Sequence, residues 1–254
     1  MSDMNQNYAA PAPSLDAGRA AAIDAGLRTY MIRVYNYMVA GVALTGIVAW
    51  LTFQAAVVTD ASGAITVLTP FGTAIFGGPA IIMLVLGTLG LVMFISFRIQ
   101  HLQPSTALTL FMVYAAALGL MLAPLFLKYT GASVARVFFI SAASFGALSV
   151  YGYTTQRNLS AVGSFLIMGL FGLIIASLVN IFLKSSGLDW ALSVIGVLIF
   201  AGLTAWDTQK IKEFYDPQDD GTVAGRKVVM GALSLYLDFI NLFLMLLRLM
   251  GDRR

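Results

Sequence analysis

Two aspartates near the end of the chain, Asp207 and Asp238, lie in long apolar runs. Asp207 closes the run WALSVIGVLIFAGLTAWD, and Asp238 lies within VVMGALSLYLDFINLFLMLL. An ionised acid in a lipid-spanning helix costs roughly 2.5–3.5 kcal/mol on insertion scales, so such acids are rare and usually face a polar interior. Because intramembrane acids commonly mark ion or proton pathways, the sequence predicts a functional pair at these positions.

The chemistry expected of this pair depends on protons. Two carboxylates that share a site of low dielectric cannot both ionise at low cost, so one proton tends to be shared between them. With that proton the two side chains can hydrogen-bond and hold their helices together. Without it they repel each other, and their exposed oxygens suit a hard cation such as calcium. We therefore predict a pH sensor and gate at Asp207 and Asp238 that binds calcium transiently. The alternative is that the charges only neutralise one another and fix helix packing.

The residues around Asp238 indicate which way it faces. Polar or small residues recur at alternating steps of four and three, which places them on one helical face. These residues are Lys227, Gly231, Ser234, Asp238, Asn241, Met245 and Arg248. We call them the polar stripe. The other faces of this helix are apolar, so the sequence predicts that the stripe lines a polar path, with Ser234 and Asn241 as candidate pore-lining residues.

The overall composition is that of an integral membrane protein. Of 254 residues, 59% are hydrophobic and 11% are charged, whereas a soluble domain carries about a quarter charged residues. The net charge of +3 is small and spread over loops, which argues against nucleic-acid binding. The chain has no cysteine and a single histidine, which excludes thiolate or multi-histidine metal centres. We expect no cofactor, calcium being a permeating ion.

The apolar runs predict an all-α polytopic membrane protein with seven transmembrane helices. The expected spans cover about 34–57, 79–97, 105–127, 134–155, 162–183, 189–208 and 228–249. The small residues of the fourth span favour close helix packing.

The N-terminal region differs in composition from the spans. Residues 1–15 are polar and predict a disordered tail, and 16–33 predict an Ala-rich amphipathic helix at the membrane surface. The expected domains are therefore a cytoplasmic tail with an interfacial helix over 1–28, and a seven-helix transmembrane domain over 29–254.

Basic residues predict the orientation, because cytoplasmic loops carry an excess of Lys and Arg. That excess falls on the side of the N-terminus, which we therefore expect in the cytoplasm. A seventh span would place Arg248, Arg253 and Arg254 outside, against the rule, so a re-entrant last segment is the alternative. In this topology Arg98, Asp207 and Asp238 share one half of the membrane and can meet.

Four stretches carry a family resemblance. They are AGLRTYMIRVYNYMVAGVALTG (25–46), SVYGYTTQRNLSAVGSFLIMGLFGLIIASLVN (149–180), FAGLTAWDTQKIK (200–212) and SLYLDFINLFLMLLRL (234–249). Together, in this order, they resemble the bacterial members of the Bax inhibitor-1, or transmembrane Bax-inhibitor-motif, family. The resemblance covers nearly everything after about residue 25.

This resemblance implies a fold and an activity. The family's fold is seven helices with the last one central and wrapped by the other six, and its studied members are pH-sensitive calcium leaks. Its paired aspartates match Asp207 and Asp238, and its arginine latch matches Arg98. The loop between the aspartates departs from the family pattern, because segment 216–225 is longer than in compact members. A bacterial inner-membrane location follows, with the lipid bilayer, calcium ions and protons as partners.

Two other functions are open to the sequence. One is an interaction protein that regulates a membrane-bound quality-control protease, which the polar N-terminal tail would suit and with which bacterial relatives are associated. The other is an intramembrane aspartyl protease, whose pattern requires Tyr-Asp on one helix and Gly-x-Gly-Asp on the next. Here Ala205-Trp206 and Tyr236-Leu237 precede the acids, so we expect no enzyme.

Overall fold

The computed structural model describes residues 14–60 and 65–254, with the side chains of residues 14–21 left out of the description. The tail expected over residues 1–15 therefore lies almost wholly outside the described residues. The elements in chain order are α1 (Ser14–Ala56), β1 (Val57–Thr59), β2 (Ile65–Leu68), α2 (Pro70–Phe76), α3 (Gly78–Arg98), the 3-10 turn η1 (Ile99–His101), α4 (Pro104–Leu122), α5 (Leu125–Lys128), α6 (Gly131–Thr154), α7 (Ser160–Leu183), α8 (Ser186–Glu213) and α9 (Gly221–Met250). The strands β1 and β2 pair as an antiparallel hairpin.

Local sequence signals set the helix boundaries. A proline stands in the first turn of α2, α3 and α4, where the missing N–H has no helical partner to lose. The side chains of Thr130, Ser185 and Asp220 cap α6, α8 and α9 by accepting hydrogen bonds from backbone N–H groups. Between α7 and α8, Lys184 adopts a left-handed conformation with φ 50°, which ends α7.

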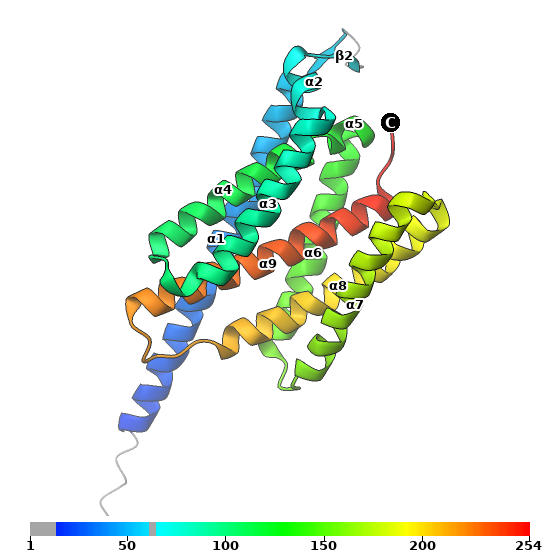
Figure 1. Ribbon diagram of the computed structural model, residues 1–254. Helices are drawn as coiled ribbons and strands as arrows, with labels where there is room; N and C mark the ends of the chain where they lie inside the picture. Colours follow the sequence, from blue (N-terminus) through cyan, green and yellow to red (C-terminus); the bar gives the residue numbers. More distant parts are fainter. Residues whose placement is uncertain (1–13, 61–64) are drawn as a thin grey trace, which may run out of the picture.

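Seven helices of the described chain are long and apolar enough to cross a membrane, which confirms the predicted all-α, seven-span architecture. Their limits are Ala22–Ala56, Gly78–His101, Pro104–Lys128, Gly131–Thr154, Ser160–Leu183, Ser186–Glu213 and Gly221–Met250. α9 is continuous over 30 residues, or about 45 Å, which is long enough to cross a membrane and gives no break of the kind that a re-entrant segment needs. α1 begins and α9 ends at opposite ends of the bundle (Figure 1), as an odd number of spans requires.

The N-terminal helix differs from the expectation. α1 runs without a break through 43 residues from Ser14 to Ala56, so the boundary expected between 28 and 29 falls inside a helix. Residues 22–33 continue the first span and do not form a separate surface helix. The physical reason is that no proline or turn-forming cluster interrupts this Ala-rich segment, and its two glycines, Gly18 and Gly26, cost a helix only about 1 kcal/mol each.

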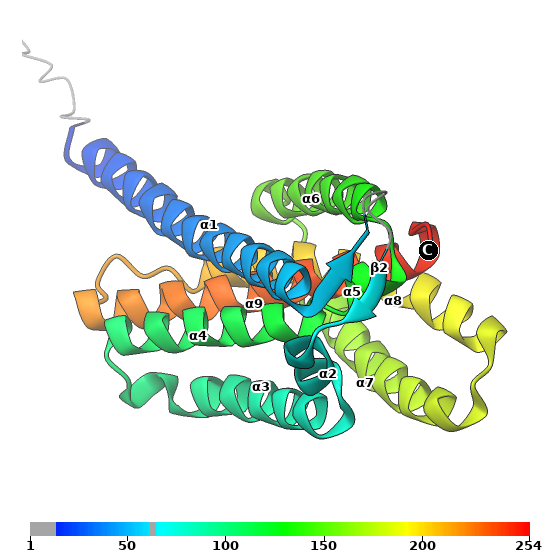
Figure 2. The same cartoon turned by 90° about the horizontal axis from the view of Figure 1, so that it is seen from above.

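The last helix lies at the centre of the bundle. In its most apolar stretch 72% of α9 is buried inside the protein, against 6% for α7. α9 packs mainly on α1, α4, α6 and α8, while α3 covers α4 and α7 covers α8. Figures 1 and 2 show α9 running through the middle of the bundle in both views. The expected central helix is therefore observed, with four helices in its main contact layer and two outside them.

A buried polar contact fixes the middle of α9 against its neighbours. The Tyr236 hydroxyl lies 2.7 Å from Thr45 Oγ1 of α1, which in turn lies 2.8 Å from the Ala115 carbonyl of α4. The Tyr236 ring packs edge-on against Phe111 and Tyr114 of α4, with centroids 5.3 and 5.9 Å away. In lipid a buried hydroxyl must find its partner within the protein, so this contact defines the register of three helices.

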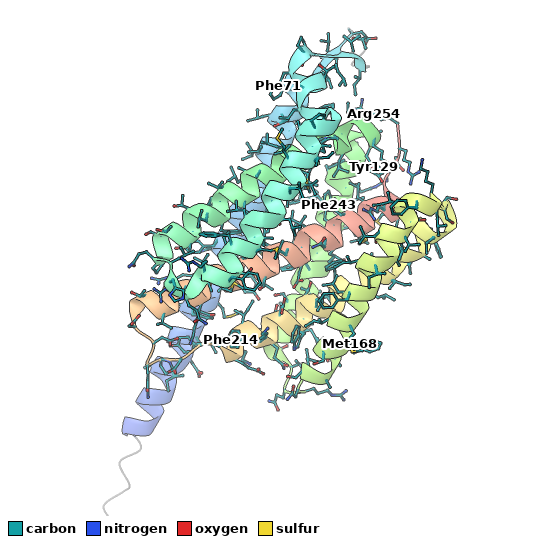
Figure 3. The ribbon with its side chains drawn as sticks, viewed as in Figure 1. Phe71, Tyr129, Met168, Phe214, Phe243 and Arg254 are labelled. Carbon is teal, nitrogen blue, oxygen red and sulfur yellow. The ribbon has the colours of Figure 1, made fainter. Side chains whose placement is uncertain are left out.

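The end of α9 is held by the segment that follows it. The Arg254 N–H donates to the Lys128 carbonyl at 3.0 Å, and the Thr130 N–H donates to the Asp252 carbonyl at 3.1 Å. Arg136 of α6 forms an ion pair with Asp252 at 2.9 Å. Figure 3 shows Tyr129 and Arg254 together at this end of the bundle. These bonds attach the far end of α9 to the junction of α5 and α6.

The topology can be tested by chemical labelling, because the chain has no cysteine of its own. His101 ends the η1 turn between α3 and α4, Ser186 begins α8, and both are exposed. The α3–α4 connection and the α7–α8 turn lie at opposite ends of the bundle (Figure 1). We expect a membrane-impermeant thiol reagent added to intact cells to label Ser186→Cys and to spare His101→Cys until the cells are opened. The reverse result would contradict the predicted cytoplasmic N-terminus, and labelling of both in intact cells would contradict the seven-span arrangement.

Candidate functional site

Asp238 lies near the middle of α9 and is 5% exposed. Its Oδ2 atom is buried and has no hydrogen-bond partner among the described residues. A buried carboxyl oxygen without a donor is costly, so few such atoms persist in proteins without a role. The atom therefore points to a proton, a water molecule or an ion as its partner during function.

The second acid comes from α8. Asp207 is partly buried, and its carboxyl group lies close enough to that of Asp238 for the two to interact electrostatically. Both side chains line the same cavity. The structure thus brings together the two acids that the sequence singled out, from helices whose packing is among the most extensive in the bundle.

A lysine of the same helix, Lys210, is the cation whose charge acts on Asp207. Lys210 follows Asp207 by three residues on α8, and its charge acts on that carboxylate. Its Nζ atom also lies 4.8 Å from the centre of the Trp206 ring. Arg98, the last residue of α3, is exposed, and across the described residues no hydrogen bond or ion pair joins it to either aspartate. The arginine latch stays a prediction, and the i,i+3 spacing was the signal that could have identified Lys210.

Two cavities meet at the acid pair. The larger, of about 970 Å³, lies between α7, α8 and α9, and Asp207 and Asp238 line it together. The smaller, of about 570 Å³, lies between η1, α8 and the start of α9. Asp207, Lys210 and Ser234 line both cavities, so they stand at the junction. At its other end the larger cavity reaches Asp189 and Arg248, near the opposite side of the bundle.

The polar stripe of α9 faces these cavities along its whole length. Lys227, Gly231 and Ser234 line the smaller cavity. The remaining members, Asp238, Asn241, Met245 and Arg248, line the larger one. Asn241 donates its amide N–H to the Leu237 carbonyl at 2.8 Å, which leaves its side-chain oxygen free for the cavity. Spacing alone predicted that these residues share one face, and that face borders both cavities. The polar path along it stays a prediction.

The long loop before α9 is docked at the mouth of the smaller cavity. Asp219 forms an ion pair with Lys227 at 2.5 Å, and the Asp220 side chain accepts hydrogen bonds from two N–H groups of the first turn of α9. The Tyr215 ring lies 5.6 Å from that of Tyr30 on α1. The acids of this loop are therefore committed to structural contacts, and its extra length does not prevent docking.

A hydrogen-bond chain crosses three helices beside Asp207. The Tyr35 hydroxyl of α1 lies 2.6 Å from Ser149 Oγ of α6, which lies 2.9 Å from Thr208 Oγ1 of α8. One turn away, α6 approaches α8 so closely at Gly152 that a Cβ there would lie 2.1 Å from the Ala205 carbonyl oxygen. Small residues permit such approaches between membrane helices. Asp207 is therefore positioned by α6 as well as by its own helix.

The close approach at Gly152 predicts a stability effect. We expect Gly152→Ala to destabilise the purified protein by about 1–3 kcal/mol, because the added carbon must push α6 away from a backbone carbonyl. Thermal unfolding in detergent measures this effect. The matched control is Gly146→Ala on the same helix, where a Cβ meets nothing within 4 Å and alanine is the better helix former. Equal melting temperatures for the two variants would show that the contact does not position α8.

Comparison with known proteins finds relatives over most of the chain. The family model described as "Inhibitor of apoptosis-promoting Bax1" matches residues 27–254. The inner membrane protein YbhL of Escherichia coli (strain K12) is 46% identical over 232 residues, which cover 91% of this chain and 94% of the relative. A protein of Rickettsia prowazekii is 49% identical over 91% of this chain and 92% of its own length. A membrane protein of Streptococcus pyogenes is 36% identical over 90% of this chain and 94% of its own.

Proposed function

This chain belongs to the Bax inhibitor-1 family of membrane proteins, and from that premise we propose that it is a proton-regulated calcium leak. The path runs along the polar stripe of α9, through the two cavities that meet at the acid pair. Asp207 and Asp238 sense the proton and form the gate. The protein is an integral membrane protein with seven apolar helices, so the ion would cross within the bundle.

The junction of the two cavities supports this proposal most directly. A leak needs space on both sides of a narrow, polar constriction, and here Asp207 and Ser234 belong to both cavities while Asp238 lies one turn further along α9. The side chains at this point offer carboxylate, hydroxyl and amide oxygens, which are the ligands that calcium prefers. Oxygen ligands at the junction of two cavities suit a calcium ion that passes from one cavity to the other.

The small number of oxygen ligands at the acid pair favours a site through which calcium passes over a site that holds calcium permanently. Calcium in a resident site takes six to eight oxygen ligands. Among the described residues no group of three or more His, Cys, Asp or Glu side chains is placed to hold a metal ion. Two acids with a few neutral oxygens bind a dehydrated cation weakly, and weak binding at a constriction allows an ion to leave again.

Protonation changes the constriction through charge. When the pair holds one proton, its carboxyl groups can share a hydrogen bond and keep α8 and α9 together. When the proton leaves, two like charges face each other in a site of low dielectric, which favours separation and attracts a cation. Lys210 offsets part of the negative charge at Asp207. The charge on the path, and hence the flux, varies with pH.

The central test is calcium flux into liposomes that contain only the purified protein, measured over a range of pH. We expect Asp238→Asn to change the flux about tenfold or more, equivalent to ~1.4 kcal/mol in the barrier, and to flatten its pH dependence. Asp207→Asn should also flatten it. The control is Asp216→Asn, which removes an exposed loop acid and keeps the oxygen that accepts from the Gln218 N–H. An Asp238→Asn protein that is folded and has unchanged flux and pH response would refute the proposal.

The two candidate cations can be separated by the same assay. Removal of a positive charge beside the pair makes ionisation of the pair less favourable, so the midpoint of the pH response should move to higher pH. Because Lys210 is the cation that acts on Asp207 in the structure, we expect Lys210→Gln to produce the larger shift. A larger shift in Arg98→Gln would show instead that Arg98 reaches the pair in the conducting conformation, as the family resemblance implies.

A further inference from the structure

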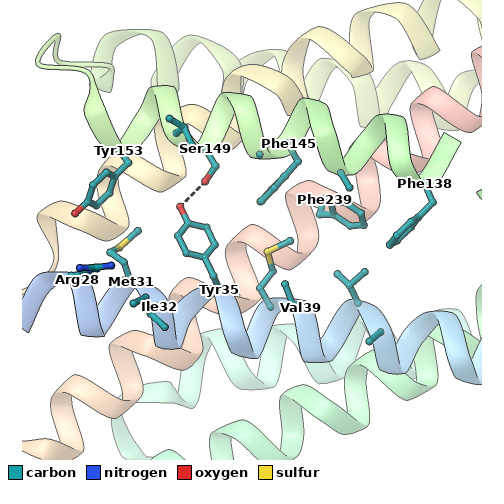
Figure 4. Close-up of a pocket in the computed structure, with 16 residues that line it drawn as sticks. Arg28, Met31, Ile32, Tyr35, Val39, Phe138, Phe145, Ser149, Tyr153 and Phe239 are labelled. Carbon is teal, nitrogen blue, oxygen red and sulfur yellow. Dashed lines mark hydrogen bonds between the residues drawn. The ribbon is translucent and has the colours of Figure 1, made fainter. Parts of the chain in front are cut away.

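The helices α1 and α6 leave a groove between them on another face of α9. Its main cavity, of about 840 Å³, has walls from α1 and α6 and a floor at Phe239 (Figure 4). Apart from its ends, the lining is apolar, with Met38 and Phe145 among the side chains. The hydroxyl groups of Tyr35 and Ser149 lie in the wall, and they hydrogen-bond to each other at 2.6 Å. The groove therefore suits an apolar occupant.

A second cavity continues the groove toward the other side of the membrane. It has a volume of about 560 Å³ and shares Val42, Phe138 and Phe239 with the first. The first cavity begins at Arg28 and the second reaches Trp50, and both residues belong to α1. Twenty-two residues of helix span about 33 Å, which is close to the thickness of the hydrocarbon core. The groove thus runs through the depth of the bilayer.

A positive charge marks one end of the groove. Arg28 lines the first cavity and is exposed, and Tyr153 of α6 lies across from it (Figure 4). Among the side chains that the structure describes, no carboxylate forms an ion pair with Arg28, including Asp24 one turn earlier. Lys212 adds a second charge nearby, because its Nζ lies 5.1 Å from the centre of the Tyr153 ring. The Lys212 Nζ also donates to the Tyr153 carbonyl at 2.9 Å, so of the two cations Arg28 is the one that lines the cavity. An apolar groove with positive charge at one end is complementary to a lipid with an anionic headgroup.

We propose that this groove holds one anionic phospholipid, with an acyl chain between α1 and α6 and its phosphate at Arg28. The guanidinium group can donate two hydrogen bonds to a phosphate, and the Tyr153 hydroxyl can donate another. The acyl chain covers Val39 of α1 and Val150 of α6, which line the cavity and are exposed. This lipid is a resident component of the fold, and its binding does not depend on the calcium pathway proposed above.

The shape of the groove favours a chain over a helix from a partner or a second copy. The Phe138 ring reaches across to Phe239, with the centroids 5.6 Å apart in an edge-on contact, and so divides the groove into its two cavities. A partner helix with its side chains is straight and about 10–12 Å wide, so the contact between Phe138 and Phe239 would prevent it from lying along the whole groove. A flexible acyl chain can bend around the ring.

Two glycines allow the groove to be filled without disturbing the protein. Gly146 lines the first cavity and Gly46 the second, and a Cβ at either position meets nothing within 4 Å. A leucine at 146 should therefore project into the space of the acyl chain. Gly172 of α7 is the matched control, since a Cβ there also meets nothing within 4 Å and the residue lines neither cavity.

The test is native mass spectrometry of the full chain in detergent, with phosphatidylglycerol or phosphatidylcholine of the same acyl chains added. We expect one phosphatidylglycerol molecule to remain bound to the protein at collision energies that remove all other bound lipid molecules. Gly146→Leu should lose this retention, and Gly172→Leu should keep it. Arg28→Gln should reduce the preference for phosphatidylglycerol about fivefold, the size of one basic side chain's attraction to an anionic lipid. Arg33→Gln, an exposed α1 residue outside the groove, should not.

Several outcomes would overturn the proposal. They are equal retention in Gly146→Leu and Gly172→Leu, equal retention of the two lipids by the parent protein, and a dimer that Gly146→Leu dissociates, which would make a second copy the occupant. If Gly146→Leu does not fold, the parent protein decides: phosphatidylglycerol with a photoactivatable acyl chain should label peptides of α1 and α6. Labelling confined to α3 and α7 would refute the assignment.

Discussion

The position of one charged group in lipid constrains this whole structure. Asp238 must not face the bilayer, where an acid costs several kcal/mol, so the helix that carries it must be surrounded by protein. α9 accordingly packs on four other helices, and many of its side chains, Tyr236 and Leu242 among them, are fully buried. α3 and α7 carry no such acid, and they lie outside with apolar side chains toward the lipid. The order of the layers therefore follows from where the polar groups stand in the sequence.

Periodicity made the central features predictable. Seven apolar runs predicted seven spans, because in lipid a helix forms the backbone hydrogen bonds of a segment within that same segment. The polar stripe predicted which face of α9 borders the cavities, because residues spaced by three and four lie on one side of a helix in any surroundings. Asp207 and Asp238 could be selected without knowledge of the fold, since an acid in an apolar run is informative by itself.

Features that depend on contact between distant segments could not be predicted. The link from Tyr35 to Ser149 to Thr208 joins residues more than fifty positions apart at each step, and nothing in the local sequence of any of them indicates the others. Arg98 was singled out from its depth in the membrane and from the family resemblance, and its role as a latch stays a prediction. In the structure the charge of Lys210, on the same helix as Asp207, acts on that carboxylate. Depth fixes a residue along the membrane normal and leaves its rotation and lateral position open. The length of α1 was missed because composition changes near residue 34 while the helix does not.

α9 connects the two functional surfaces of the molecule. Consecutive residues, Asp238 and Phe239, face the cavity of the acid pair and the groove between α1 and α6. The walls of the groove are tied to the acid pair by a second route, since Ser149 of α6 binds Tyr35 in the groove and Thr208 next to Asp207. α6 also contacts α8 backbone to backbone at Gly152, where no side chain can absorb a displacement.

A change in the separation of α1 and α6 must therefore either break this hydrogen-bond chain or move α8, and α8 carries one of the two carboxyl groups. Packed membrane helices respond to such a demand by shifting between discrete arrangements, because close-packed interfaces do not deform continuously. The wall of the groove and the helix that carries Asp207 are thus connected through a single helix, α6.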